Sequence, residues 1–252
     1  MEKNRRSFLK QITALTTAVA LAPTSLSALS VKENKGGNGY TFLFQGDSIT
    51  DGNRTRNNDW NHVMGHGYQY IIASKLWYEF PAKGFHFFNR GISGNKIPDL
   101  LARWQLDTLD LKPDLLSVLI GINDVAASIE GKPDFSIDNY RDGYVSLLEK
   151  TRESLPNIQL VLCDPFVLPV GKVKDKWTKY LTEVQNRQAV VKELAAKYNA
   201  IHVPFQSAFD KALVKAPAEY WIWDGVHPMP AGHELMAREW LRQVTKKLKF
   251  IK

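Results

Sequence analysis

The chain has 252 residues, of which 44% are hydrophobic and 23% are charged. This composition is typical of a globular protein and excludes the collagen-like, fibrous and intrinsically disordered classes. A single cysteine excludes an intramolecular disulfide and a Cys-rich zinc module. Of the net charge of +7, residues 1–30 carry +3 (four Lys or Arg against one Glu), which leaves +4 for the rest of the chain. We therefore expect no nucleic-acid partner.

The N-terminus resembles an export signal. The hexapeptide RRSFLK at residues 5–10 is similar to a twin-arginine motif, and the apolar stretch after it, about 12–22, is too short to span a bilayer. We predict that residues 1–30 are a signal peptide read by the twin-arginine export machinery and that 31–39 are a Gly-rich linker. Residues 40–252 are predicted to be one domain that works in the periplasm or outside the cell, without stable membrane insertion. An N-terminal anchor or surface helix is the alternative for the first segment.

Short apolar runs alternate with helical patterns over the rest of the chain. The runs lie at residues 40–45, 85–89, 114–120, 158–163 and 200–203. Apolar residues at helical spacing lie between or after them, at 140–151 behind Ser136 as a candidate N-cap, at 177–198 and at 235–248. Near-continuous apolar strands indicate a parallel sheet that is covered on both faces. The alternation predicts an α/β fold, a three-layer α/β/α sandwich with five parallel strands.

Segments that could carry chemistry follow these strands, and ligands of open α/β sheets bind at the carboxyl ends of the strands. After the first strand stands Ser48, as an exposed nucleophile or as a helix N-cap. Thr50 replaces the second Gly of an α/β-hydrolase elbow, so that motif does not fit. In 89–95 two glycines permit close approach of backbone N–H groups to a ligand, or an ordinary turn. After the third strand, Asn123 could donate to a developing oxyanion or cap a helix.

A fourth segment places Asp224 three residues before His227, just ahead of the C-terminal helix. At this spacing the carboxylate could keep one ring nitrogen protonated and leave the other as a base. Of the six histidines, only His227 has a nearby Asp in a loop of this kind. His202 in the fifth strand and His233 in the following helix are expected to be structural, whereas His66 could line a pocket.

Together these segments resemble the SGNH/GDSL hydrolases. The matching blocks are, in chain order, Gly46-Asp47-Ser48-Ile49, residues 89–95, Gly121-x-Asn123-Asp124 and Asp224-x-x-His227-Pro228. The resemblance extends from about residue 40 to residue 240. The amino-acid sequences of 89–95 and 224–228 resemble those of the bacterial esterase branch that includes carbohydrate acetylesterases and lysophospholipase-like enzymes. Ile49 replaces the Leu of the family's name, an apolar change that should not affect the chemistry.

The resemblance implies a flavodoxin-like fold and a serine esterase that needs no metal or organic cofactor. Ser48 would be the nucleophile, His227 the general base and then the acid, and Asp224 the residue that orients His227. The backbone N–H groups of Ser48 and Gly94 and the side chain of Asn123 would form the oxyanion hole, where donors stabilise charge that develops in the transition state.

The substrate is predicted from aromatic residues near the site loops and from the family resemblance. Trp60, His66, Trp221 and Trp223 lie in or beside the site loops and are candidate substrate-binding residues. Their aromatic faces could stack on sugar rings, or they could pack the loops. We predict an exported carbohydrate O-acetylesterase that acts on a glycan or small-molecule ester. A lysophospholipase or short-chain lipid esterase is the alternative.

Two other classes of protein compete with this interpretation. A metal-dependent phosphoesterase could use the acidic and imidazole side chains of Asp47, Asp51, Asp124, Asp224 and His227. The chain lacks, however, the Asp-x-His start and the Gly-Asn-His pair that such enzymes resemble. A non-catalytic sugar-binding module would not be expected to keep the complete Ser48, Asp224 and His227 set.

Overall fold

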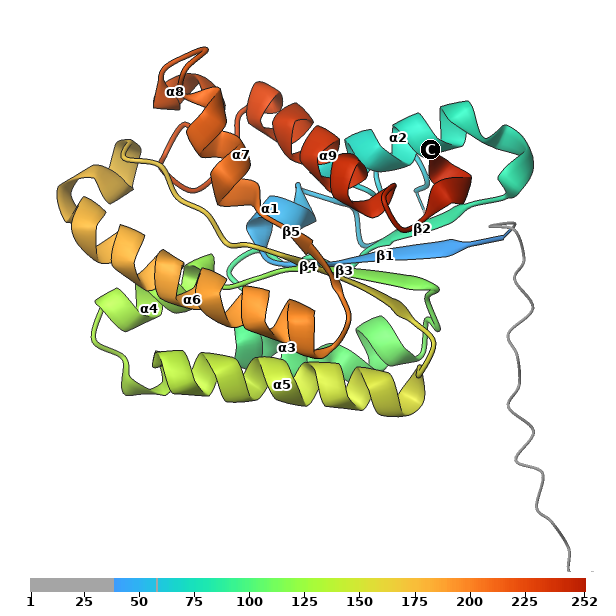
Figure 1. The fold of residues 1–252 in the computed structure, drawn as a ribbon, viewed down its shortest axis with the longest axis horizontal. Coiled ribbons are helices and arrows are strands. Elements are labelled where there is room, and N and C mark those ends of the chain that lie inside the picture. Colours follow the sequence, from blue (N-terminus) through green and yellow to red (C-terminus); the bar gives the residue numbers. More distant parts are fainter. Residues whose placement is uncertain (1–38, 58) are drawn as a thin grey trace, which may run out of the picture. The chain divides into compact units, whose positions relative to one another are not determined.

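The computed structural model describes residues 39–57 and 59–252, which form one compact unit around a parallel sheet (Figure 1). The strands are β1 (Thr41–Gly46), β2 (His86–Asn89), β3 (Leu115–Leu119), β4 (Gln159–Cys163) and β5 (Ile201–Val203). Their order across the sheet is β2-β1-β3-β4-β5, and all neighbours are parallel. The predicted five-stranded α/β fold is confirmed, with each strand end within one residue of its apolar run. The predicted signal peptide and residues 31–38 of the linker lie outside the described residues.

Helices pack on both faces of the sheet. They are α1 (Ser48–Asp51), α2 (Tyr68–Glu79), α3 (Ile97–Trp104), α4 (Ile122–Ile129), α5 (Ile137–Ser154), α6 (Trp177–Lys197), α7 (Phe205–Ala212), α8 (Ala218–Trp221) and α9 (Pro230–Val244). Figure 1 shows α2, α7 and α9 on one face of the sheet and α3, α5 and α6 on the other. Among the described residues, no helix combines the length and apolar character that a bilayer crossing requires.

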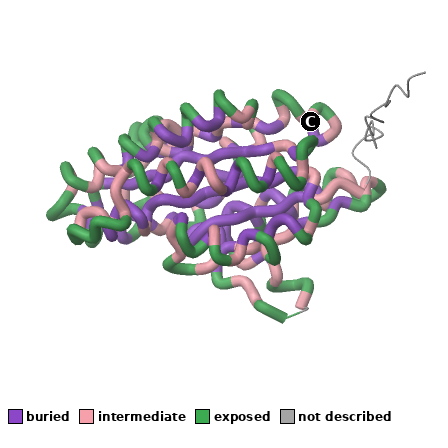
Figure 2. Tube along the Cα trace, turned by 90° about the horizontal axis from the view of Figure 1, so that it is seen from below, coloured by how far each residue is buried: buried purple, intermediate pink, exposed green. Residues whose placement is uncertain are grey.

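The strands are apolar on both faces because both faces are covered. In β1, Phe42 and Phe44 pack toward the α2–α9 layer, and Leu43 between them packs toward the α3–α5 layer. The other central strands alternate in the same way, so the sheet is buried along its length (Figure 2). This double burial produces the unbroken apolar runs in the sequence.

The helix boundaries follow local signals in most places. Ser136 is the N-cap of α5, as predicted, and its hydroxyl accepts the backbone N–H of Asn139 at 3.2 Å. Helix α6 matches the predicted stripe at 177–198. The predicted end of the C-terminal helix, at residue 248, is wrong, because α9 ends at Val244. Just after it, the Thr245 hydroxyl donates to the carbonyl of Leu241. Leu248 still packs against the core, from the turn after the helix.

The strand order reverses at β1 and β3. The chain leaves β1 toward β2 at one edge, then returns to place β3 on the other side of β1. Such a reversal opens a crevice between the two strand ends, where α/β proteins bind ligands. Ser48 follows β1 and Asn123 follows β3, so both predicted site residues lie at this point.

Candidate active site

Ser48 is the first residue of helix α1, directly behind the end of β1. The N-cap of this helix is Asp47, whose carboxylate accepts the backbone N–H of Ile49 at 3.0 Å. Asp47 therefore does the capping, and the Ser48 hydroxyl is left for other contacts. At the strand end, a Cβ on Gly46 would lie 2.3 Å from the carbonyl oxygen of Leu119, so only glycine allows this approach of β1 to β3.

Ser48, His227 and Asp224 form a hydrogen-bonded chain. Ser48 Oγ lies 2.9 Å from His227 Nε2, and His227 Nδ1 lies 2.8 Å from Asp224 Oδ2. An ionised carboxylate only accepts hydrogen bonds, so Nδ1 carries the proton and Nε2 accepts from the serine hydroxyl. The structure thus brings together three side chains from the two ends of the chain in the order that a serine hydrolase requires.

The Asp224 carboxylate is held by more than the imidazole. Its Oδ1 accepts the backbone N–H groups of Val226 at 3.0 Å and His227 at 2.7 Å, and Lys172 Nζ lies 3.0 Å from its Oδ2. Burial raises the pKa of Asp224, but these hydrogen bonds together hold it far below its usual range. Lys172 lies on the 3₁₀ segment Gly171–Lys176, which comes so close that a Cβ on Gly171 would meet the Asp224 backbone at 2.5 Å.

The second predicted donor segment, residues 89–95, is named the β2 loop here. It packs directly on α1, since a Cβ on Gly91 would come within 2.4 Å of the backbone nitrogen of Asp51. Gly94 lies exposed on this loop with φ +83°, a conformation that favours glycine. From the end of β3, Asn123 Nδ2 donates to the Asn95 carbonyl at 3.1 Å, which uses one of its two N–H groups.

Polar contacts that the sequence did not suggest hold the β2 loop against α1. The amide nitrogen of Asn89 donates to the carbonyls of Thr50, Asp51 and Met64 at 2.7–3.1 Å. Asn89 Oδ1 accepts the backbone N–H of Gly91 at 2.9 Å. A strand-end Asn was the available signal, but its partners lie 25–39 residues away in the sequence.

Two buried carboxyl groups flank the site residues. Asp47 precedes Ser48 and Asp124 follows Asn123, and each leaves one carboxyl oxygen without a hydrogen-bond partner. Burial, with a smaller contribution from the charge of Asp124, raises the pKa of Asp47 to about 7, and burial raises the pKa of Asp124 to about 6. A buried carboxyl group in this position favours its neutral form.

The predicted substrate-binding residues differ in where they lie. The exposed Trp223 ring lies 6.5 Å from the His227 ring at an interplanar angle of 26°, so its face borders the hydrogen-bonded chain. Trp221 is half-buried, and its Nε1 donates to the carbonyl of Ala216, so it packs the loop. His66 is exposed and lies near the buried His233, whose pKa is lowered by burial and, to a smaller extent, by His66 and His227. His233 Nδ1 accepts the backbone N–H of Tyr68.

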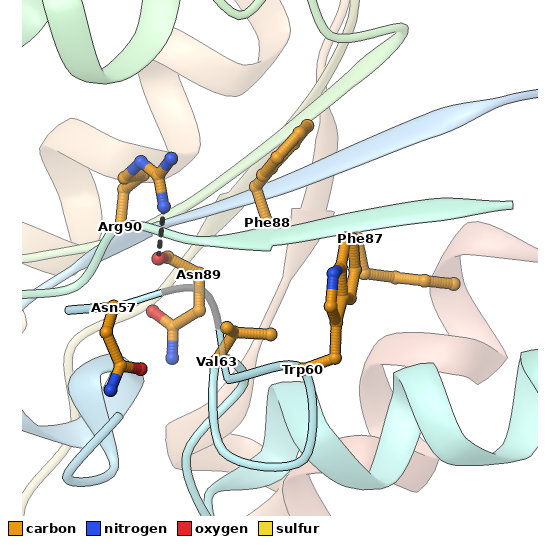
Figure 3. A pocket seen from close by; sticks show the side chains of 7 residues that line it. All are labelled: Asn57, Trp60, Val63, Phe87, Phe88, Asn89 and Arg90. Atoms are coloured by element: carbon orange, nitrogen blue, oxygen red, sulfur yellow. Dashed lines mark hydrogen bonds between the residues drawn. The ribbon is translucent and has the colours of Figure 1, made fainter. Parts of the chain in front are cut away.

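Trp60 lies in a different place. Its exposed indole stands beside Phe87 in a hollow on the edge strand β2, shown in Figure 3. The hollow is also lined by Asn57, Val63, Phe88, Asn89 and Arg90. The lining of this hollow includes none of Ser48, Asp224 and His227.

The donor set considered for a metal is not gathered in one place. In residues 39–57 and 59–252, no three His, Cys, Asp or Glu side chains come together as ligands of one metal ion. His202, expected to be a satisfied core residue, is half-buried and lies 2.6 Å from Asp164 Oδ1.

The flavodoxin-like sheet and the hydrogen-bonded chain of Ser48, His227 and Asp224 at its strand ends are the arrangement typical of a serine hydrolase. The comparisons with known proteins agree. The profile of the GDSL-like Lipase/Acylhydrolase family matches residues 44–235. The chain belongs to this family and is a carboxylic ester hydrolase.

Its relatives include an acetylxylan esterase. The chain is 34% identical over 214 residues to the acetylxylan esterase of Geobacillus stearothermophilus, an alignment that covers 82% of this chain and 95% of the relative. The solved structure of that esterase has a TM-score of 0.73 and covers 85% of this chain and 98% of its own. Its catalytic mutants include Ser, Asp and His replacements by Ala. A GDSL-like protein of Parabacteroides merdae is 39% identical, with a TM-score of 0.79 and coverage of 83% and 97%.

Proposed function

We propose that this protein removes acetyl groups from the hydroxyls of a xylan-type carbohydrate, with Ser48 as nucleophile, His227 as general base and Asp224 as orienting carboxylate. The hydrogen-bonded chain from Ser48 Oγ through His227 to Asp224 carries the proposal. The substrate class is supported by the 34% identity to an acetylxylan esterase over 82% of the chain.

Acylation uses the short contact between serine and histidine. His227 Nε2 takes the hydroxyl proton while Ser48 Oγ attacks the acetyl carbon, and the carbonyl oxygen becomes an oxyanion. When this intermediate collapses, the bond to the sugar oxygen breaks and that oxygen takes the proton from Nε2. The products are the free sugar hydroxyl and an acetyl group on Ser48.

Deacylation repeats the proton transfers with water. His227 Nε2 takes a proton from water, whose oxygen attacks the acetyl carbon, and then returns the proton to Ser48 Oγ as acetate leaves. In both steps the Asp224 carboxylate keeps the proton on Nδ1 and stabilises the transient imidazolium. The low pKa of Asp224 keeps this carboxylate ionised across the working range of a neutral esterase.

The oxyanion is stabilised by donors from three strand ends. We assign this role to the backbone N–H groups of Ser48 and Gly94 and to the second N–H of the Asn123 amide. They belong to α1, the β2 loop and the start of α4, which follow β1, β2 and β3, three neighbouring strands of the sheet. Removing one such donor typically costs about 3–4 kcal/mol of transition-state stabilisation.

An aromatic surface beside the base supports a sugar as the alcohol part of the ester. Trp223 is 61% exposed, although an indole of this size is usually well buried. Its ring lies next to His227, where the departing sugar hydroxyl receives its proton. Stacking of a sugar ring on this face would orient the ester toward Ser48.

The proposal is tested with one substrate panel and three proteins. Acetylated xylo-oligosaccharides, p-nitrophenyl acetate, p-nitrophenyl palmitate and a lysophospholipid are offered to wild type, Ser48→Ala and Trp223→Ala. We expect wild type to prefer acetyl esters and Ser48→Ala to be inactive. Trp223→Ala should lose more activity on the acetylated oligosaccharide than on p-nitrophenyl acetate. Preference for palmitate or the lysophospholipid would replace the carbohydrate by a lipid substrate.

We also propose that the protein is exported through the twin-arginine machinery. The order of Arg5-Arg6, apolar stretch and small residues in the sequence supports it. Arg5→Lys with Arg6→Lys should leave precursor in the cytoplasm, detected by fractionation and N-terminal sequencing. Export of the double variant, or an intact Met1 on the exported wild type, would contradict it.

A further inference from the structure

The peptide bond between Ser93 and Gly94 lies at the centre of a four-residue turn. The backbone N–H of Asn95 donates to the carbonyl of Ile92 at 3.1 Å, and Gly94, the third residue, has φ +83°. Positive φ at this position is the mark of a type II turn, which differs from type I by a flip of the central peptide. The Gly94 N–H belongs to that peptide, so the turn decides where this N–H points.

The residues on both sides of the peptide are anchored. The backbone N–H and the hydroxyl of Ser93 both donate to Asp51 Oδ2, each at 3.0 Å. On the other side, the Asn95 carbonyl accepts from Asn123 Nδ2 at 3.1 Å and its amide oxygen accepts from Arg103 Nε at 2.8 Å. Gly94 between them faces open space, since an added Cβ would meet no heavy atom within 4 Å.

Asp51 is itself fixed at the end of the helix that begins with Ser48. Its side chain is buried, and both carboxylate oxygens accept from the Arg56 guanidinium, at 3.1 and 2.8 Å. Oδ1 also accepts the backbone N–H of Arg54 at 3.2 Å. Burial raises the pKa of Asp51, but Arg56 and Ser93 outweigh it and hold the pKa below its usual value.

We propose that Asp51 is a positioning residue for catalysis: its carboxylate, locked by Arg56, holds Ser93 and thereby aims the backbone N–H of Gly94 at the oxyanion. This inference rests on the proposed function of Ser48 and Gly94. Asp51 touches no reacting atom. It joins the helix of the nucleophile to the loop of the second donor, so that the two donors keep one spacing.

A carboxylate is the group that this position requires. Asp51 accepts five hydrogen bonds from N–H and O–H donors and gives none. An amide of the same shape has one accepting oxygen and an NH₂ group that donates, so it would face at least one donor with another donor. Asp51→Asn therefore keeps the volume of the side chain and removes half of its accepting capacity.

The test measures hydrolysis of p-nitrophenyl acetate, which does not depend on the identity of the carbohydrate. We expect Asp51→Asn to lower kcat by about 10–100-fold, the order of loss for a displaced catalytic group, with KM within about twofold of wild type. Inhibition by methylboronic acid, whose adduct on Ser48 is tetrahedral, should weaken by the same factor as kcat/KM. The matched control is Asp59→Asn, because Asp59 accepts from Asn61 and His62 in the neighbouring loop.

If Asp51→Asn does not fold, a milder variant, Ser93→Ala, tests the same positioning role. Ser93→Ala leaves Asp51 paired with Arg56 and removes only the hydroxyl contact, so kcat should fall about 3–10-fold with KM unchanged. Unchanged kcat in a folded Asp51→Asn, or in Ser93→Ala where the first variant does not fold, overturns the positioning role. A loss that appears only as a raised KM or a lower melting temperature also overturns it. Full activity of Ser48→Ala would instead overturn the proposed function.

Discussion

The two halves of the candidate site are built in different ways. The nucleophile half, α1 with the β2 loop, is held by a buried network whose partners lie 25–42 residues apart in the sequence. The base half is one short loop, in which Asp224 accepts from residues two and three positions further on. His227 is 35% exposed, and Lys172 approaches Asp224 from solvent with 56% of its side chain exposed. The first half is positioned by buried hydrogen bonds between distant residues, whereas the second half is exposed to changes in charge and salt.

The largest expected effect comes from the base half. His227→Ala should lower kcat by about 10⁴-fold or more, since loss of one member of a catalytic triad abolishes its concerted action. Steady-state kinetics on p-nitrophenyl acetate measures the effect, and added imidazole should restore part of the activity. The control is His202→Ala, which removes a histidine that pairs with another Asp. Near wild-type turnover of His227→Ala would refute its role.

The nucleophile half should tolerate loss of one donor better. Asn123→Ala should lower kcat by about 10²–10³-fold with little change in KM, because the two backbone donors that we propose, Ser48 and Gly94, remain. Asn139→Ala, another amide near a helix N-terminus, serves as the control. If Asn123→Ala is as inactive as His227→Ala, the oxyanion hole has no independent backbone donors and the division into halves fails.

Stability against pH probes the buried side of the nucleophile half. The pKa of Asp47, raised by burial to about 7, lies above the ordinary value of about 4 in an unfolded chain. Between these values the folded protein keeps a proton that the unfolded chain has released, so the free energy of unfolding falls as pH rises. One group contributes at most about 1.4 kcal/mol per pH unit.

Asp47→Asn should remove this contribution and flatten the decline between about pH 4 and 7. Urea unfolding at several pH values measures it. The difference between the two curves cancels the effect of His233, whose pKa burial lowers to about 4 and which acts with the opposite sign. Parallel curves for wild type and variant would show that Asp47 does not titrate in this range.

The smallest effect is expected at the exposed edge of the base half. Lys172 Nζ lies 3.0 Å from Asp224 Oδ2 and helps to hold the pKa of that carboxyl low, so Lys172→Met should weaken the hold on the carboxylate that we propose orients His227. The loss in kcat/KM should be roughly 1.4–5-fold, the equivalent of the 0.2–1 kcal/mol typical of exposed ion pairs. Added salt should lower kcat/KM of wild type in the same direction, because it screens the pair. Lys174→Met is the control, and a wild-type kcat/KM that is insensitive to salt would contradict the prediction.

The sequence predicted what depends on local pattern. The strands, Ser136 as a cap and the Ser48–His227–Asp224 set follow from apolar runs and short motifs, and the hydrogen bonds place that set together. In the sequence Asp51 stood out only as one of several acidic candidates for a metal site, because its proposed role needs Arg56 and Ser93 folded around it. Trp60 was grouped with the site loops, but its loop turns toward the edge strand, a direction that composition does not encode.

The single thiol of the chain, on Cys163, reports how often the core of the protein opens locally. Cys163 is fully buried at the end of β4, within 3.7 Å of the Ser117 hydroxyl on β3, and burial raises the pKa of its thiol. A thiol-specific reagent can therefore react only after the core around Cys163 has opened. The rate at which Cys163 Sγ is modified therefore measures how often this opening occurs, and no label needs to be introduced. Because the chain has no second cysteine with which to pair, its refolding forms no intramolecular disulfide.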